Sequence, residues 1–198
     1  YLQLSQLNSV SGFDAFIDDK GVFQFYLEGP ELIDKKSEPE RLIKSSCGAC
    51  DADGLEELIS DLPILDIDSR KIDFGKLNQA FDSMKLKQQG FRTTGGMHAA
   101  GIVDYDYNLL YLKEDIGRHN AVDKVIGAAA VKNFDFNNSI LLLSGRCGWD
   151  IVAKCCRSNI RTIASIGACS SLAASTARKS GMRIFSFVKP DNAVIIGG

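Results

Sequence analysis

The chain has 198 residues, a hydrophobic fraction of 45% and a formal net charge of −2, values typical of a globular protein with one well-buried domain. The near-neutral charge provides no general attraction to nucleic acid or to an anionic membrane, so we expect neither as a partner. No apolar run approaches the roughly 18 residues that a membrane span needs. The first residues lack both a signal peptide and an initiator Met, so we expect a truncated chain.

The N-terminal part predicts strands followed by a connector. Residues 13–29 have the pattern of two strands around the turn DDKG. The charged stretch over residues 34–41 indicates an exposed connector. We therefore divide the chain into a small β-rich part over residues 1–44 and a larger domain over residues 45–198.

The larger domain opens, after a cysteine-containing loop, with a predicted amphipathic helix. Its apolar positions are Phe74, Leu77, Phe81 and Met84. Asp73 is the expected N-cap, and Gly90 is the expected C-terminal stop.

From residue 93 onward, predicted helices and strands alternate. Residues 93–115 predict a glycine turn and two strands, and the helix predicted after them places Val122, Val125, Ile126 and Ala129 on one face. The run SILLLSG is typical of a strand buried on both sides. Strands are also predicted over 160–168, 183–188 and 192–197, and helices over 149–158 and 170–181. This alternation predicts an α/β fold with a largely parallel sheet.

Polar clusters follow three of the predicted strands. In EDIGRHNAVDKVIG (residues 114–127), Arg118 would clamp a phosphate and Asn120 would cap the helix or bind a hydroxyl. The segments LSGRCGWD and GACSS repeat this arrangement, and Arg146 would lie near Arg118 if their strands are parallel neighbours. Strand ends of this kind form the crevice where α/β proteins bind ligands, here an anionic, nucleotide-like one. The alternative is a network that only fixes the strand–helix turn.

Neither standard nucleotide-binding motif is present. No GxGxxG follows a strand and no GxxxxGK[ST] occurs. In TTGGMHAA, the N–H groups of Gly95 and Gly96 would cradle an anion, and His98 is either a structural residue or a contact to that ligand.

Two of the six cysteines, Cys47 and Cys50, flank a Gly-Ala pair in SSCGAC. The spacing is compatible with a metal site, a disulfide switch or a sulfur carrier. A zinc site normally needs four ligands, and the other cysteines lie about 100 residues away, so zinc stays undecided. Zinc deaminases need H-x-E before P-C-x-x-C; here the order is reversed and Ala100 replaces the Glu. A chain of this length without a secreted cysteine framework indicates a reducing compartment, hence the cytoplasm.

The segments SSCGAC, TGGMHAA, EDIGRHNAVDKVIG, SGR and SSLAASTA occur in this order and together resemble the formate dehydrogenase accessory sulfurtransferase family. The resemblance runs from about Ser45 to the C-terminus, and EDIGRHNAVDKVIG is highly specific by itself. It implies a three-layer αβα fold similar to that of the cytidine deaminases, without the deaminase catalytic residues. It also implies a homodimer and a usual N-terminal segment that is truncated here.

The same resemblance implies a function. Such proteins accept sulfur as a persulfide from a cysteine desulfurase and pass it to the molybdenum or tungsten of a bis-molybdopterin guanine dinucleotide cofactor, which formate dehydrogenase needs. Cys47 is the expected carrier and Cys50 the assisting thiol, which makes the chain a sulfurtransferase. One alternative is a binding module that delivers the cofactor without carrying sulfur. Another is a zinc-dependent hydrolase that uses Cys47, Cys50 and His98.

The resemblance also implies a cofactor site, and we expect no resident metal. The turn after the penultimate strand belongs to this site, although KPDN is equally typical of a hairpin turn. The expected contacts are Phe187, Val188, Lys189, Pro190, Asp191 and Asn192, together with His98, Arg118, His119, Asn120 and Arg146. Cys147 and Cys169 depart from the family pattern, and we interpret them as packing thiols that leave room for extra redox chemistry.

Overall fold

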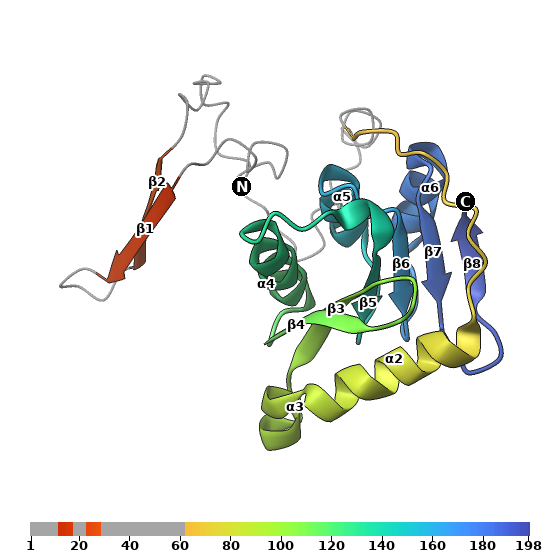
Figure 1. Cartoon of the computed structure of the whole chain (residues 1–198), viewed down its shortest axis with the longest axis horizontal. Coiled ribbons are helices and arrows are strands. Elements are labelled where there is room, and N and C mark those ends of the chain that lie inside the picture. Colours follow the sequence, from red (N-terminus) through yellow and green to blue (C-terminus); the bar gives the residue numbers. More distant parts are fainter. Residues whose placement is uncertain (1–11, 18–22, 29–61) are drawn as a thin grey trace. The chain divides into compact units, whose positions relative to one another are not determined.

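The computed structural model describes residues 12–17, 23–28 and 62–198. The chain divides into two compact units, Tyr1–Ser46 and Cys47–Gly198. In the first unit, β1 (Gly12–Ile17) pairs antiparallel with β2 (Phe23–Glu28), which confirms the two predicted strands (Figure 1). The predicted boundary at residues 44 and 45 lies outside the described residues, as do Cys47 and Cys50, so these stay predictions.

The second unit is built on a six-stranded sheet with the order β4-β3-β5-β6-β7-β8. The strands are β3 (His98–Val103), β4 (Leu109–Asp115), β5 (Ile140–Leu143), β6 (Thr162–Ser165), β7 (Arg183–Ser186) and β8 (Val194–Gly197). The helices are α2 (Phe74–Lys87), α3 (Gln89–Thr94), α4 (Arg118–Ala130), α5 (Trp149–Arg157) and α6 (Ser171–Ser180), with a 3₁₀ turn, η3, at Phe136–Asn138.

The sheet is mixed, so the prediction of a largely parallel sheet was wrong in part. β5, β6 and β7 are parallel neighbours, whereas β3 runs antiparallel to both β4 and β5, and β8 runs antiparallel to β7. Because β3 opposes both of its neighbours, β4 points the same way as β5. The carboxyl ends of β4, β5, β6 and β7 therefore meet at one edge of the sheet.

Helix α2 covers one face of the sheet, and Figure 1 shows it running across the strand direction. Its buried residues Leu77, Phe81 and Met84 form one core cluster with Ile140 and Leu142 of β5. Side chains alternate between the faces of a strand, so the buried Leu141 and Leu143 point to the opposite face. The continuous apolar run is thus explained by burial on both sides, as predicted.

Helices α4, α5 and α6 cover the opposite face. Each joins two strands that point the same way and move in one direction along the sheet, and right-handed crossovers place all such helices on one face. The predicted apolar face of α4 is buried through Val122, Val125, Ile126 and Ala129. The result is a three-layer α/β arrangement, which agrees with the predicted layering; the likeness to cytidine deaminases stays a prediction.

The start of α2 agrees with the sequence and its end does not. Asp73 is the N-cap, and its side chain accepts a hydrogen bond from the Lys76 N–H at 3.0 Å. The helix stops at Lys87 rather than near Gly90. The reason is tertiary: the Glu114 carboxylate accepts hydrogen bonds from the N–H groups of Gly90 and Phe91 at 2.9 and 2.8 Å, which starts the separate helix α3.

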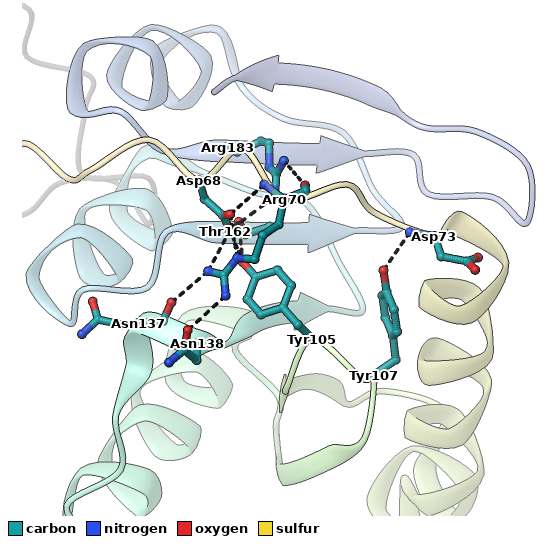
Figure 2. A network of polar contacts seen from close by, with 9 residues as sticks. All are labelled: Asp68, Arg70, Asp73, Tyr105, Tyr107, Asn137, Asn138, Thr162 and Arg183. Carbon is teal, nitrogen blue, oxygen red and sulfur yellow. Dashed lines mark hydrogen bonds and ion pairs between the residues drawn. The ribbon is translucent and has the colours of Figure 1, made fainter.

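The segment before α2 is held at the amino-terminal edge of the parallel strands by a buried polar network (Figure 2). Asp68 accepts hydrogen bonds from Arg70 Nε at 2.8 Å, from Thr162 Oγ1 at 3.0 Å and from the Tyr105 hydroxyl. Arg183 donates to the Arg70 carbonyl at 2.7 Å and lies 3.3 Å from Asp68. The network ties residues 68–70 to the starts of β6 and β7, so its role is structural.

None of the helices that the structure describes is both long and apolar enough to cross a membrane.

Candidate functional site

The candidate site is the edge where the parallel strands end. Each of these strands leads at this edge into a segment that the sequence singled out: residues 115–120 after β4, 144–150 after β5, 166–170 after β6 and 187–192 after β7. β3 adds its first residue, since His98 pairs in register with Asp115. The topology therefore brings all the predicted cofactor segments to one edge.

The turn between β4 and α4 is organised by Asp115. Its carboxylate accepts hydrogen bonds from the Gly117 N–H at 2.8 Å and from Asn120 Nδ2 at 3.2 Å, and it pairs with Lys124 at 2.5 Å. The hydrogen bond from Lys124, with that from Gly117, lowers the pKa of Asp115 to about 2. Asn120 thus fixes the turn in this structure, which is the structural alternative for that residue.

The side chains of His98 and Arg118 both approach Gly145, the residue that precedes Arg146. A Cβ atom at Gly145 would lie 3.0 Å from His98 Nδ1 and 4.0 Å from the Arg118 Cδ, so the start of β3, the end of β5 and the start of α4 converge here. The condition under which Arg146 was expected near Arg118, that their strands are parallel neighbours, is not met, because β3 lies between β4 and β5. Convergence at one edge survives, since β4 and β5 point the same way.

The turn after β6 approaches the turn after β5 through their backbones. A Cβ atom at Gly167 would lie 2.9 Å from Arg146 N and from the carbonyl of Gly145, so only glycine permits this contact. The Ser165 hydroxyl donates to the Gly145 carbonyl at 2.6 Å and accepts from the Gly167 N–H at 3.0 Å. These bonds hold the backbone before Arg146 against the turn after β6.

Cys147 and Cys169 face each other beyond this contact. They form an isolated parallel bridge, flanked by hydrogen bonds from Cys147 N–H to the Ala168 carbonyl at 2.9 Å and from Ser170 N–H to the Cys147 carbonyl at 3.0 Å. Cys147 is only 1% exposed, whereas Cys169 is half-buried. The Cys147 thiol lies 4.0 Å from the Gly148 carbonyl and the Cys169 thiol 3.5 Å from the Ser170 carbonyl. The proximity of the two thiols raises the pKa of Cys147, together with burial, and lowers the pKa of Cys169.

His119 and Asp150 join the first turns of α4 and α5. The His119 Nε2 lies 2.6 Å from the Asp150 Oδ2, but the contact is not aligned as a hydrogen bond. Burial lowers the pKa of His119, with Asp150 acting in the opposite direction. Burial likewise raises the pKa of Asp150, against the effect of His119.

The turn after β7 is a hairpin, closed by a hydrogen bond from the Lys189 N–H to the Asn192 carbonyl at 2.8 Å. Phe187 is 49% exposed and has a backbone φ of 53°, a strained value for a residue with a side chain. Its N–H donates to the Gly167 carbonyl at 3.3 Å, which attaches the turn to the site edge. The side chain of Val188 packs in the core under α2 and therefore supports the turn from inside, whereas Lys189, Pro190, Asp191 and Asn192 are exposed.

The edge carries donors that lack acceptors. Among the described residues, Arg118 and Arg146 form no ion pair, and the buried Arg118 Nε and Trp149 Nε1 have no hydrogen-bond partner. Helices α4 and α5 have glycine N-caps, Gly117 and Gly148, which provide no side-chain hydrogen bond to the first turn. Open helix starts beside unpaired guanidinium groups suit an anionic ligand.

The zinc alternative depends on Cys47 and Cys50, which lie outside the described residues, so it stays a hypothesis. Within residues 62–198 and the two N-terminal strands, no group of three or more His, Cys, Asp and Glu side chains could hold a metal ion. A surface hollow of about 360 Å³ lies at the other edge, lined by residues such as Pro63, Asp66 and Arg157, and includes none of the predicted site residues.

Sequence reasoning missed three features of the edge. The first is the position of Trp149 and Asp150, which belong to the segment LSGRCGWD that was noted for Arg146. Asp150, as a polar residue in the first turn of a predicted helix, could have indicated a site residue. The close approach of Gly167 was signalled only by its position after a strand. The pairing of Cys147 with Cys169 had no signal in the sequence, because it depends on the register of two loops.

Comparison with known proteins supports the family. The model of the FdhD/NarQ family matches residues 8–197. The "Sulfur carrier protein FdhD" of Thermoplasma volcanium is 39% identical over 150 residues, which cover 76% of this chain and 54% of that protein. The protein of the same name from Thermoplasma acidophilum is 34% identical over 189 residues, covering 94% and 66%.

A solved structure shows the same fold. A protein from Desulfotalea psychrophila, assigned as a formate dehydrogenase accessory protein, superposes with a TM-score of 0.69 at 23% identity, covering 100% of this chain and 72% of the other. The chain spans about half the length of several curated relatives that it matches. The family match over nearly the whole chain, on a fold shared with this structure, shows that the chain belongs to the FdhD/NarQ family.

Proposed function

We propose that this protein is a sulfur carrier for the maturation of formate dehydrogenase. The observation that carries the proposal is the match of residues 8–197 to the FdhD/NarQ family, together with the similarity of this chain to proteins named sulfur carriers. Cys47 would accept sulfur from the persulfide of a cysteine desulfurase, and Cys50 would assist its transfer. The recipient would be the molybdenum or tungsten of a bis-molybdopterin guanine dinucleotide, bound as substrate.

The transfer to Cys47 is an exchange reaction. The Cys47 thiolate attacks the outer sulfur of the donor persulfide, a new sulfur–sulfur bond forms on Cys47, and the donor cysteine leaves as a thiolate. No net oxidation occurs, because the sulfane sulfur only changes its thiol partner. The reaction needs no acid or base beyond the two thiols.

The strand edge supports the proposal because it offers groups that could bind the expected substrate. Its unpaired Arg118 and Arg146, the open starts of α4 and α5 and the exposed ring of Phe187 offer partners for phosphates and a flat ring. The same donors would serve a module that only holds and delivers the cofactor, which is the second candidate function. The two candidates differ at Cys47.

The test is mass spectrometry after incubation with a cysteine desulfurase and cysteine. Trypsin separates the thiols, since Cys47 and Cys50 fall in residues 45–70, Cys147 in 147–154 and Cys169 in 162–178. We expect one added sulfur, about 32 Da, on peptide 45–70, lost in Cys47→Ser and kept in the control Cys156→Ser, a buried thiol of α5. If an active desulfurase leaves that peptide unchanged, the delivery module is the better description.

A further inference from the structure

The carboxyl edge contains a pair of thiols with unequal access. Cys169 lies half-buried just before Ser170, the N-cap of α6, and Cys147 lies beneath it with 1% exposure. A reagent from solution therefore reaches Cys169 first, and Cys147 meets only what Cys169 carries. This is the arrangement of an attacking thiol and a resolving thiol.

The spacing allows a bond between the two sulfur atoms. The cysteines are direct partners in a parallel bridge, held in register by backbone hydrogen bonds on both sides of Cys169. Neighbouring strands lie about 4.8 Å apart, and a disulfide accepts Cα separations of roughly 4.4–6.8 Å. Side chains of directly paired residues lie on the same face, so the two thiols can join without a change of register.

The pKa values of the two thiols differ in the direction that their exposure suggests. The neighbouring Cys147 thiol, together with the nearby Arg178 and against the effect of burial, lowers the pKa of Cys169. The neighbouring Cys169 thiol and burial raise the pKa of Cys147 well above the ordinary value. The accessible thiol is thus the more acidic of the two.

We propose that Cys169 accepts sulfane sulfur from a persulfide and that Cys147 then displaces it as sulfide, leaving a Cys147–Cys169 disulfide at the edge where the cofactor is expected. In the first step, Cys169 bonds to the outer sulfur of the donor and the donor thiol leaves. In the second step, Cys147 attacks the inner sulfur of the Cys169 persulfide, and the outer sulfur leaves as hydrosulfide with the proton of Cys147. Two electrons pass from the dithiol to the sulfane sulfur, and a small thiol reductant restores the pair.

The inference rests on the proposed function, because it takes a persulfide as donor, and it explains a need of that function. Sulfur on a carrier cysteine is sulfane sulfur, whereas a terminal sulfur ligand on a metal is formally sulfide. Two electrons must therefore enter during delivery. A dithiol beside Arg146 and Gly167 would supply them at the point of transfer.

The experiment uses a protein in which the two expected carrier thiols, Cys47 and Cys50, are replaced. The background protein is Cys47→Ser/Cys50→Ser, reduced and then treated anaerobically with glutathione persulfide. We expect release of about one sulfide per chain, a loss of about 2 Da, and a cross-link between tryptic peptides 147–154 and 162–178. Adding Cys147→Ser should trap one sulfur, about 32 Da, on peptide 162–178 and prevent the cross-link. Adding Cys169→Ser should abolish the release of sulfide and the cross-link.

Two controls keep the result interpretable. Cys156→Ser changes a buried thiol of α5 and should leave the products unchanged, and Cys147→Ala replaces Cys147→Ser if a buried hydroxyl lowers the melting temperature. The proposal is overturned if the background protein releases no sulfide above a cysteine-free control, or if Cys147→Ser traps no sulfur on Cys169. Loading of Cys47 by a desulfurase is measured separately, so failure of one proposal is distinct from failure of the other.

Discussion

The His119 Nε2 lies 2.6 Å from the Asp150 Oδ2, which joins the first turn of α4 to the first turn of α5. The two residues come from segments on either side of β5, and neither helix start has a side-chain cap. Their contact fixes the spacing between the two open helix starts, and therefore the spacing between the N–H groups that face the site.

This contact predicts the titration of His119. Burial lowers its pKa and the Asp150 charge opposes that effect, so Asp150→Asn should lower the pKa of His119 further. Two-dimensional NMR of the imidazole groups measures it directly, because the chain has only two histidines and His98→Gln assigns the other. Asp135→Asn, at the N-cap of the η3 turn, is the control and should leave the titration unchanged. An unchanged or higher pKa in Asp150→Asn would show that the carboxylate does not act on His119.

The unpaired arginines predict anion binding at the strand edge. Guanosine diphosphate is a suitable probe, since it carries the guanine and phosphates of the expected substrate. Arg118→Ala and Arg146→Ala should each weaken binding about tenfold, the value of one charge-assisted contact of roughly 1.5 kcal/mol. Calorimetry at two salt concentrations checks this, with Arg157→Ala at the last turn of α5 as the control. Equal affinities for all four proteins would contradict an anion site here.

The close approach of Gly167 predicts a large effect from a single methyl group. Gly167→Ala should destabilise the fold by about 1–3 kcal/mol, because the new Cβ would meet the backbone of Gly145 and Arg146 at 2.9 Å. The matched control is Gly127→Ala in α4, where nothing lies within 4 Å. That change should stabilise the protein by about 0.5–1 kcal/mol through helix propensity. Denaturant unfolding measures both; a neutral Gly167→Ala would mean that the turns separate easily.

The strained backbone at Phe187 predicts that two substitutions differ in stability but weaken binding equally. With φ at 53°, a residue without a Cβ is favoured. Phe187→Gly should therefore be more stable than Phe187→Ala by about 1 kcal/mol. Both variants lack the exposed ring, so both should bind guanosine diphosphate more weakly than the parent and to the same extent. Undiminished binding would exclude stacking on Phe187.

The network of Figure 2 predicts a stability effect that depends on pH. Asp68→Asn leaves Arg183 and Arg70 without their carboxylate, and loss of one partner of a buried pair costs about 3 kcal/mol. The control is Asp66→Asn, whose carboxylate is 87% exposed and pairs with Arg161 at 3.2 Å, and which should change stability by less than about 1 kcal/mol.

The sign of the pH effect follows from the pKa of Asp68. Burial alone would raise it, but hydrogen bonds from Arg70, Tyr105 and Thr162 outweigh burial and hold the pKa well below its usual range. The stabilisation is therefore complete above the unfolded pKa of about 3.9 and is lost as the pH falls below it. The difference between the parent and Asp68→Asn should shrink in acid. A difference that is constant down to pH 3 would contradict this account.

Local patterns in the sequence predicted the elements well and the sheet less well. Asp73 as N-cap and the buried face of α4 follow from residues close together in the chain. The antiparallel direction of β3 does not follow from nearby residues, because the residues of a strand do not specify whether its neighbours run parallel or antiparallel to it. The early stop of α2 likewise depends on Glu114, which lies 24 residues beyond the Gly90 N–H that it binds. For the site, the strand-end segments were predicted, but the contact of Cys147 with Cys169 was not.

The strand order also describes how the protein can be built during synthesis. After the hairpin of β3 and β4, strand β5 joins the free edge of β3, and strands β6, β7 and β8 each join the strand made just before them. No strand has to be inserted between two strands that are already paired, so the growing chain can extend its sheet in the order in which the ribosome releases it. The turn that carries Phe187 is added almost last. Strands β3 to β7 can therefore pair before this turn, a proposed ligand contact, is made.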